Sequence, residues 1–266
     1  MMEALDRLPD QINEMISDFV APAMFGNDYF GFTQYIFWML IAIAILLIVL
    51  FAAKKRQSLV PHGRFVNGVE ALVEFARNDI VYGVIGHKTG DKHMPFILTV
   101  FFFVLINNLV GLIPGCRPGT GTIGVTFAVA LCSFVYFVAL SIKIMGVGGY
   151  IKSFAPKGIA LPIALLVAVI EVFSVILRLV TLAIRLFANM FAGHIAMGAF
   201  ALMVSVMMGA AFQVVTAASF GAALAPIAIM LILILIYAIE MLVAFIQAYV
   251  FAVLSAVYIQ LAEGEE

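Results

Sequence analysis

The chain has few charged side chains, one tryptophan and two cysteines in 266 residues. Only 11% of the residues are charged, against about 25% in an ordinary soluble domain, whereas 65% are hydrophobic. So little polar surface excludes a water-soluble globular protein, and lipid must be the main solvent of this chain. The net charge of -1 gives no basis for binding nucleic acid, so no nucleic-acid partner is expected.

The sequence also lacks the patterns of metal, cofactor and nucleotide sites. Cys116 and Cys132 do not have the spacing of metal ligands. We predict two buried thiols there, with a disulfide between them as the alternative. No glycine-rich phosphate loop ending in lysine is present. We therefore expect no metal, no cofactor and no nucleotide site.

Long hydrophobic runs predict an all-α polytopic membrane protein with five transmembrane helices. A helix needs about 20 apolar residues to cross the hydrocarbon layer. The expected transmembrane helices lie at residues 35–53, 95–113, 123–145, 159–208 and 222–261. In residues 57–92, apolar residues such as Phe65, Val69 and Leu72 recur at helical spacing among charged ones, which predicts an interfacial amphipathic helix and a loop.

Basic residues indicate how the chain is oriented. Seven lysines and arginines lie between the first two expected spans and three lie at the end of the third or soon after it, whereas only Arg117 lies between the second and third. By the positive-inside rule, the first two groups and the interfacial helix are cytoplasmic. The N-terminal segment, residues 1–34, is then outside, where it would form a short amphipathic helix. Five crossings place the C-terminus in the cytoplasm, and we expect a bacterial cell membrane.

The last two apolar segments are too long for upright helices. About 45 helical residues extend over roughly 68 Å, whereas the hydrocarbon layer is about 30 Å thick. Neither segment has a polar turn that would divide it into two spans. We therefore predict a long, steeply inclined helical hairpin, which another protein holds in that attitude.

Apart from Lys143 at the cytoplasmic end of the third span, the charged residues and histidines inside the expected spans are confined to this hairpin, and such residues are usually functional. They are Glu171, Arg178, Arg185, His194 and Glu240. The first three are seven residues apart, which places them in one stripe along a helix. Glu240 and Gln247 are also seven apart and share a face of the last helix.

Antiparallel pairing of the hairpin would bring two of these pairs to the same level. Residue 216 is half-way between Arg185 and Gln247, and residue 217 is half-way between His194 and Glu240. Both midpoints fall in the expected turn. The rotation of each helix about its axis leaves the facing sides undetermined.

Each ionisable group also has a purely structural interpretation. Arg178 could extend to the cytoplasmic interface or pair with Glu171. A structural Arg185 would need a buried acid as its partner, and the sequence has few. The His194–Glu240 pair is either a clamp between helices or a proton relay. Asn189 and Gln247 are weaker candidates, because amides often bridge membrane helices.

Three motifs resemble the family of F-type ATP synthase a subunits. They are "TLAIRLFANMFAGH" at 181–194, "NNLVGLIPG" at 107–115 and "IQAYVFAVLSAVYI" at 246–259. The resemblance extends over the whole chain. It implies a stator subunit, not itself catalytic, with two offset half-channels for protons that serve a ring of subunit c. Subunit b of the peripheral stalk and the rest of the complex are the other expected partners. The alternative is a secondary ion transporter that works without a rotor.

The resemblance also assigns roles to individual residues. It implies that Arg185 is the essential arginine, with Asn189 one turn further on and Gln247 facing it. Glu171 corresponds to the acidic residue of the cytoplasmic path. His194 and Glu240 correspond to the outer pair, whose residue types some members exchange. Arg178 would be structural or accessory.

Two positions depart from the family pattern. Leu179 stands where many members have proline, and Ala188 where many have glycine. The motor ion is not encoded in this chain, but the His–Glu pair favours the proton over sodium.

Overall fold

The computed structural model describes residues 33–55, 64–154, 161–213 and 220–264, and these ranges contain helices and no strands. The elements are α3 (Gln34–Lys55), α4 (Arg64–Phe75), the π-helix η1 (Ala76–Ile85), α5 (His87–Gly111), the short 3-10 helix η2 (Gly119–Gly121), α6 (Ile123–Ser153), α7 (Leu161–Gln213) and α8 (Phe220–Glu263). Five of them, α3, α5, α6, α7 and α8, are long and apolar enough to cross a membrane. The predicted all-α fold with five spans is therefore confirmed. The amphipathic helix expected in residues 1–34 falls almost wholly outside the described residues.

Two helix bounds differ from the limits of the apolar runs. Helix α5 begins at His87 rather than at residue 95, because the polar segment before Pro95 is already helical. Helix α6 continues beyond residue 145, but Gly146 interrupts it with φ 71° and ψ 162°. Only glycine adopts such a backbone conformation without strain. The straight, apolar part of α6 therefore ends at the kink.

Helix α5 is the central element of the bundle. Of the residues in its most apolar stretch, 56% are buried, against 6% in both α7 and α8. Its inward side chains include Ile97, Phe101 and Val104, which are fully buried. Helices α3 and α8 both contact α5, so the core lies where these helices meet.

Helix α8 packs closely because one of its faces carries small side chains. Ala244, Ala248, Ala252 and Ala256 recur every four residues and are fully buried. Small residues at this spacing let helix backbones approach closely in a membrane. Helix α8 accordingly contacts α5, α6, α7 and η1.

The interfacial segment after the first span consists of α4 and η1. Helix α4 exposes Phe65 and Glu70, whereas Val66 is buried. Its last residue, Phe75, packs against the rings of Phe245 and Tyr249 of α8, both at 5.7 Å between centroids. This contact fixes α4 and η1 to the last helix.

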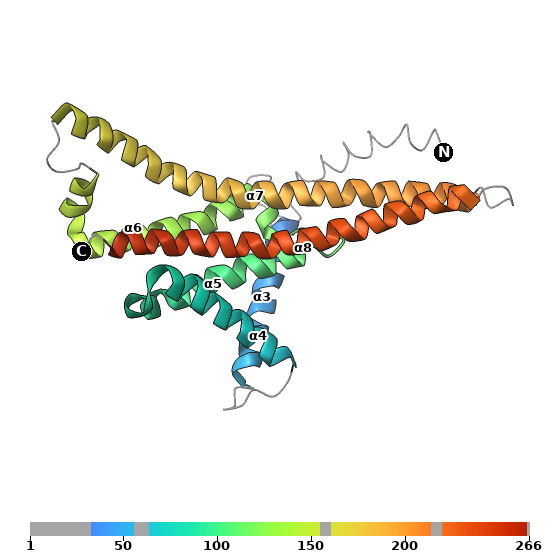
Figure 1. Cartoon of the computed structure of the whole chain (residues 1–266), viewed down its shortest axis with the longest axis horizontal. Coiled ribbons are helices and arrows are strands. Elements are labelled where there is room, and N and C mark those ends of the chain that lie inside the picture. The colour runs from blue at the N-terminus through green and yellow to red at the C-terminus, as the bar shows by residue number, and fades with distance from the viewer. Residues whose placement is uncertain (1–32, 56–63, 155–160, 214–219, 265–266) are drawn as a thin grey trace.

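Helices α7 and α8 form the long C-terminal hairpin. They run side by side along the longest axis of the molecule, and the N-terminal part of α7 diverges from α8 (Figure 1). With 53 and 44 residues they are about 80 Å and about 66 Å long. Both lengths far exceed the hydrocarbon layer of about 30 Å. An upright helix of either length would extend well beyond the layer, so a steep incline is expected for both.

Candidate functional site

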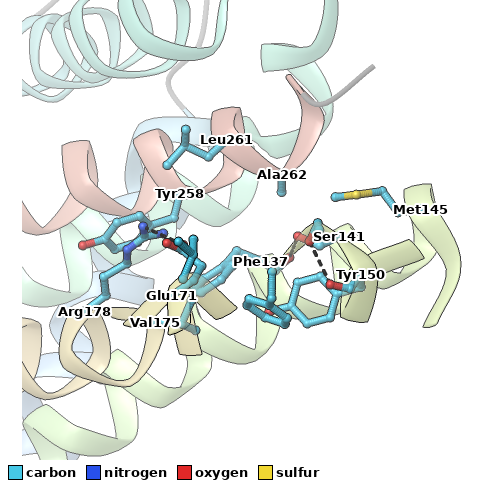
Figure 2. Close-up of a pocket in the computed structure, with 13 residues that line it drawn as sticks. Phe137, Ser141, Met145, Tyr150, Glu171, Val175, Arg178, Tyr258, Leu261 and Ala262 are labelled. Atoms are coloured by element: carbon cyan, nitrogen blue, oxygen red, sulfur yellow. Dashed lines mark hydrogen bonds and ion pairs between the residues drawn. The ribbon is translucent and has the colours of Figure 1, made fainter. Parts of the chain in front are cut away.

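A cavity of about 370 Å³ lies between α6, α7 and α8, where α7 diverges from α8. We call this cavity the vestibule. Phe137, Tyr150, Glu171, Arg178, Tyr258 and Ala262 are among the residues that line it (Figure 2). A second cavity of about 10 Å³ shares Phe137, Arg178 and Tyr258 with the vestibule. The smaller cavity has room for about one water molecule, so Arg178 and Tyr258 stand where the space narrows.

Glu171 and Arg178 form an ion pair on the vestibule side of α7. Arg178 Nη2 lies 3.4 Å from Glu171 Oε1, and the guanidinium lies over the Tyr258 ring at 5.6 Å. Both charged side chains are about a third or more exposed, so solvent screening leaves the pair a small net contribution to stability. Of the two structural interpretations of Arg178, the structure shows the pairing with Glu171. The contact with Tyr258 was not predicted.

Arg185 lies on the same helix in a different environment. Its side chain is exposed, whereas its neighbour Leu186 is fully buried. No ion pair or hydrogen bond of Arg185 occurs among the described residues, and Gln247, the expected neighbour, is itself buried. Arg185 therefore presents its charge to the outside of the described helices, and the facing of Arg185 and Gln247 stays a prediction.

His194 and Glu240 come to the same level of the hairpin. The carboxyl group of Glu240 lies directly against Gly193, where an added Cβ would be 2.7 Å from the carboxyl carbon. Glu240 Oε2 and Asn189 Nδ2 are buried and have no hydrogen-bond partner within the described ranges. Buried polar atoms without a partner are uncommon, which marks this part of the hairpin as a functional candidate.

The motif "NNLVGLIPG" contributes to the same region. A Cβ added at Gly111 would lie 3.1 Å from His194 Nε2 and 2.7 Å from Pro118 Cγ. Thr120 Oγ donates a 3.0 Å hydrogen bond to Asn108 Oδ1, and Asn108 Nδ2 donates to the carbonyl of Ala244 at 3.4 Å. These contacts hold the end of α5 and the turn after it against both helices of the hairpin. In the sequence, this motif indicated only the family resemblance. The spacing of its residues did not predict the contact between Gly111 and His194.

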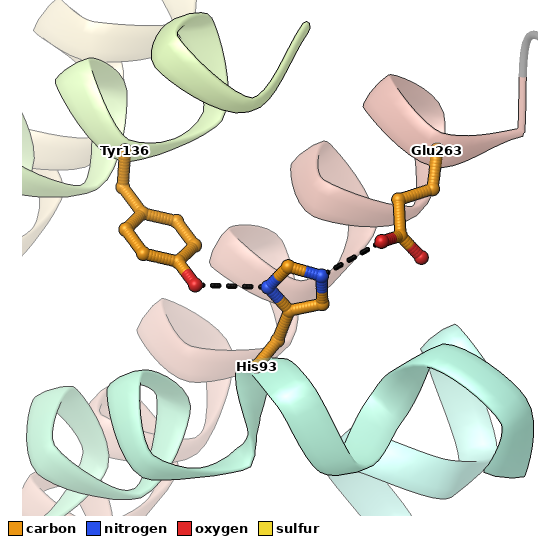
Figure 3. A network of polar contacts seen from close by, with 3 residues as sticks. All are labelled: His93, Tyr136 and Glu263. Carbon is orange, nitrogen blue, oxygen red and sulfur yellow. Dashed lines mark hydrogen bonds and ion pairs between the residues drawn. The ribbon is translucent and has the colours of Figure 1, made fainter. Parts of the chain in front are cut away.

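A buried polar network that the sequence did not predict joins α5, α6 and α8. His93 Nδ1 lies 2.8 Å from the hydroxyl of Tyr136, and His93 Nε2 lies 2.8 Å from Glu263 Oε1 (Figure 3). His93 is 4% exposed. Its partners are 43 and 170 residues away in the chain. Local sequence patterns cannot predict contacts between residues so far apart.

Both cysteines are free thiols. Cys116 is buried and Cys132 is exposed on α6. The prediction of two buried thiols is therefore wrong for Cys132. Lipid-facing positions of a membrane helix carry the same apolar residue types as its buried positions, so the sequence does not distinguish the two. Burial raises the pKa of the Cys116 thiol above its usual value.

Comparisons with known proteins agree on one family. The family model described as "ATP synthase A chain" matches residues 36–260. Proteins named "ATP synthase subunit a" are similar to this chain: that of Gluconobacter oxydans (strain 621H) is 38% identical over 86% of this chain and 87% of its own length. The protein from Rhodopseudomonas palustris (strain BisA53) is 37% identical over 88% and 89%. The chain spans only 56% of the longer relative from Anaeromyxobacter dehalogenans (strain 2CP-C), which is 36% identical over 85% of this chain.

Proposed function

Because the chain belongs to the ATP synthase A chain family, we propose that it is the membrane stator subunit of an F-type ATP synthase. It provides two offset half-channels that carry protons to and from carboxyl groups on a ring of subunit c. Proton flow through them turns the ring and so drives ATP synthesis elsewhere in the complex. The chain itself is not catalytic, and subunit b of the peripheral stalk holds it against the ring.

The exposed charge of Arg185 is the observation that carries this proposal. An arginine stays charged even in a poor solvent, and a charge within a membrane span requires a partner. No ion pair of Arg185 occurs within the described ranges, which supports the proposal that its partner is a carboxylate on another protein. At about 4 Å and an effective dielectric constant of about 20, their attraction is about 4 kcal/mol. A ring carboxyl that reaches Arg185 therefore loses its proton.

Arg185 also separates the two half-channels. Because a guanidinium does not give up its proton, it cannot pass protons between the two sides. A lysine would serve less well, since burial can deprotonate it. Asn189 and Gln247 would orient water or the arginine between the half-channels.

The outer half-channel contains His194 and Glu240. Both side chains can bind and release a proton. The buried Glu240 Oε2 and Asn189 Nδ2, which have no partner in the described part of the chain, support a path in which water completes their hydrogen bonds. Protons would enter here from outside and reach the ring carboxyl.

The inner half-channel is the vestibule. Its acid is Glu171, and the neighbouring Arg178 and Tyr258 form its narrow end. Protons released from the ring would leave through it to the cytoplasm of a bacterial cell, in which the N-terminus of the chain is outside and the C-terminus inside. Each proton that crosses about 100 mV releases about 2.3 kcal/mol, so several must pass for each ATP made.

Reconstitution tests the proposal. The complete complex in sealed lipid vesicles should make ATP when a proton gradient is imposed without added sodium, and a complex without this chain should make none. The chain should also purify together with subunits c and b. A chain that purifies alone and moves ions alone would instead be a secondary transporter. ATP synthesis that requires sodium would overturn the choice of the proton.

A further inference from the structure

We propose that His93 is a positioning residue for the inner half-channel. His93 holds the last turn of α8 in place through its contact with Glu263. This inference rests on the proposed function, in which the vestibule carries protons to the cytoplasm. It concerns His93, Tyr136 and Glu263, none of which lines the vestibule.

The network joins three helices at one point. His93 comes from α5, Tyr136 from α6 and Glu263 from the end of α8 (Figure 3). The His93 side chain is 5% exposed and that of Glu263 is 16% exposed, so water competes little for these bonds. Hydrogen bonds that involve an ionised group are roughly twice as strong as neutral ones. The bond between His93 and Glu263 is therefore the strong one of the two.

The donors and acceptors can be assigned for the His93 tautomer that carries its proton on Nε2. With Glu263 ionised, His93 Nε2 donates to Glu263 Oε1, and Nδ1 accepts from the hydroxyl of Tyr136. Lys92, which adjoins His93 on α5, also attracts the Glu263 carboxylate. Both ring nitrogens are thus occupied by partners on other helices, which fixes the His93 ring in place.

The network adjoins the vestibule through its chain neighbours. Ala262, which precedes Glu263, and Phe137, which follows Tyr136, both line the vestibule. One turn earlier on α8, Tyr258 lies beneath the guanidinium of Arg178. If the last turn of α8 loosened, Tyr258 would move away from Arg178 and the narrow end of the vestibule would change shape. Displacements of about 1 Å in such positioning can cost a site about 100-fold in rate.

Two amide variants separate the two hydrogen bonds. The side-chain amide of glutamine reaches the position of Nε2, so His93→Gln keeps a donor toward Glu263 and loses the contact with Tyr136. The shorter asparagine reaches the position of Nδ1, so His93→Asn keeps the contact with Tyr136 and loses that with Glu263. His93→Ala removes both contacts.

ATP-driven proton pumping in inverted membrane vesicles measures access to the vestibule, which then faces the medium. With equal amounts of assembled complex, His93→Ala should slow pumping about tenfold in medium of about pH 8 and much less at about pH 6, because scarce protons make poor access limiting. His93→Gln should restore most of the rate, and His93→Asn should not. If His93→Ala does not assemble, the comparison of the two amide variants decides.

Three results would overturn the inference. They are a wild-type rate in His93→Ala, a deficit of equal size at every pH, and an asparagine variant that pumps as well as the glutamine variant. A deficit that does not depend on pH would indicate a structural role alone. Failure of the proposed function is recognised separately, because the wild-type complex would then not pump protons at all.

Discussion

Arg178 and Arg185 are two turns apart on one helix and have different surroundings. Arg178 pairs with Glu171 beside the vestibule, whereas Arg185 is exposed and has no ion pair among the described residues. The seven-residue spacing predicted one stripe for all three residues. It could not predict that Tyr258 lies under Arg178, because rotation of α8 about its own axis depends on packing against α5 and α6.

Variants of His194 can distinguish a proton relay from a clamp between helices. We expect His194→Ala and Glu240→Gln each to slow proton transport about tenfold, less than is typical for a lost acid–base group because water can bridge the gap. His194→Gln is the matched control, since it keeps hydrogen bonding but does not titrate. The relay predicts that His194→Gln is as slow as His194→Ala in vesicles of equal complex content. A wild-type rate in the glutamine variant would indicate a clamp.

Cys116 should react slowly with thiol reagents. Because burial raises the pKa of its thiol, a smaller fraction is thiolate at any given pH, and the thiolate is the reactive form. In the Cys132→Ser background, the rate of maleimide labelling should keep rising above about pH 8.5, where an ordinary cysteine levels off. A small-molecule thiol under the same conditions is the reference. Labelling at the reference rate near neutral pH would contradict the burial of Cys116.

At the scale of elements, sequence patterns predicted the positions of the helices well. They predicted less of how the helices pack against one another. Apolar runs marked the five helices of the described residues that are long and apolar enough to cross a membrane, because length and composition decide whether a helix can cross a bilayer. They gave the start of α5 too late, since the polar segment between His87 and Pro95 can be helical when it is outside the hydrocarbon layer. The network of His93 was missed because its partners come from two other helices.

The kink in α6 should tolerate only glycine. Gly146→Ala forces a side chain into a backbone conformation with φ 71°, which costs on the order of 1–3 kcal/mol. Gly148→Ala is the matched control, because its added Cβ has no atom within 4 Å and alanine favours a helix over glycine by roughly 0.5–1 kcal/mol. Thermal unfolding in detergent should show a lower midpoint for Gly146→Ala and an equal or higher one for Gly148→Ala. Equal midpoints for Gly146→Ala and wild type would contradict the kink.

At the scale of the whole molecule, the most apolar stretches of the hairpin are left largely uncovered by the rest of the described residues. Only 6% of the most apolar stretch of α7 and of α8 is buried, and Arg185 is exposed on this hairpin. Lipid could cover the apolar part but would not neutralise the cation. The surface therefore suits a partner that is apolar and carries an acid at mid-membrane, as the proposed ring does.

The central claim is that Arg185 acts on carboxyl groups of a passing ring, and ATP-driven proton pumping by an Arg185→Ala complex tests it most directly. The variant should assemble with the same subunits as wild type, and pumping in inverted membrane vesicles should be abolished. Arg185→Lys, which keeps a cation that burial can neutralise, should pump far below the wild-type rate. Normal coupled pumping by an assembled Arg185→Ala complex would contradict the account.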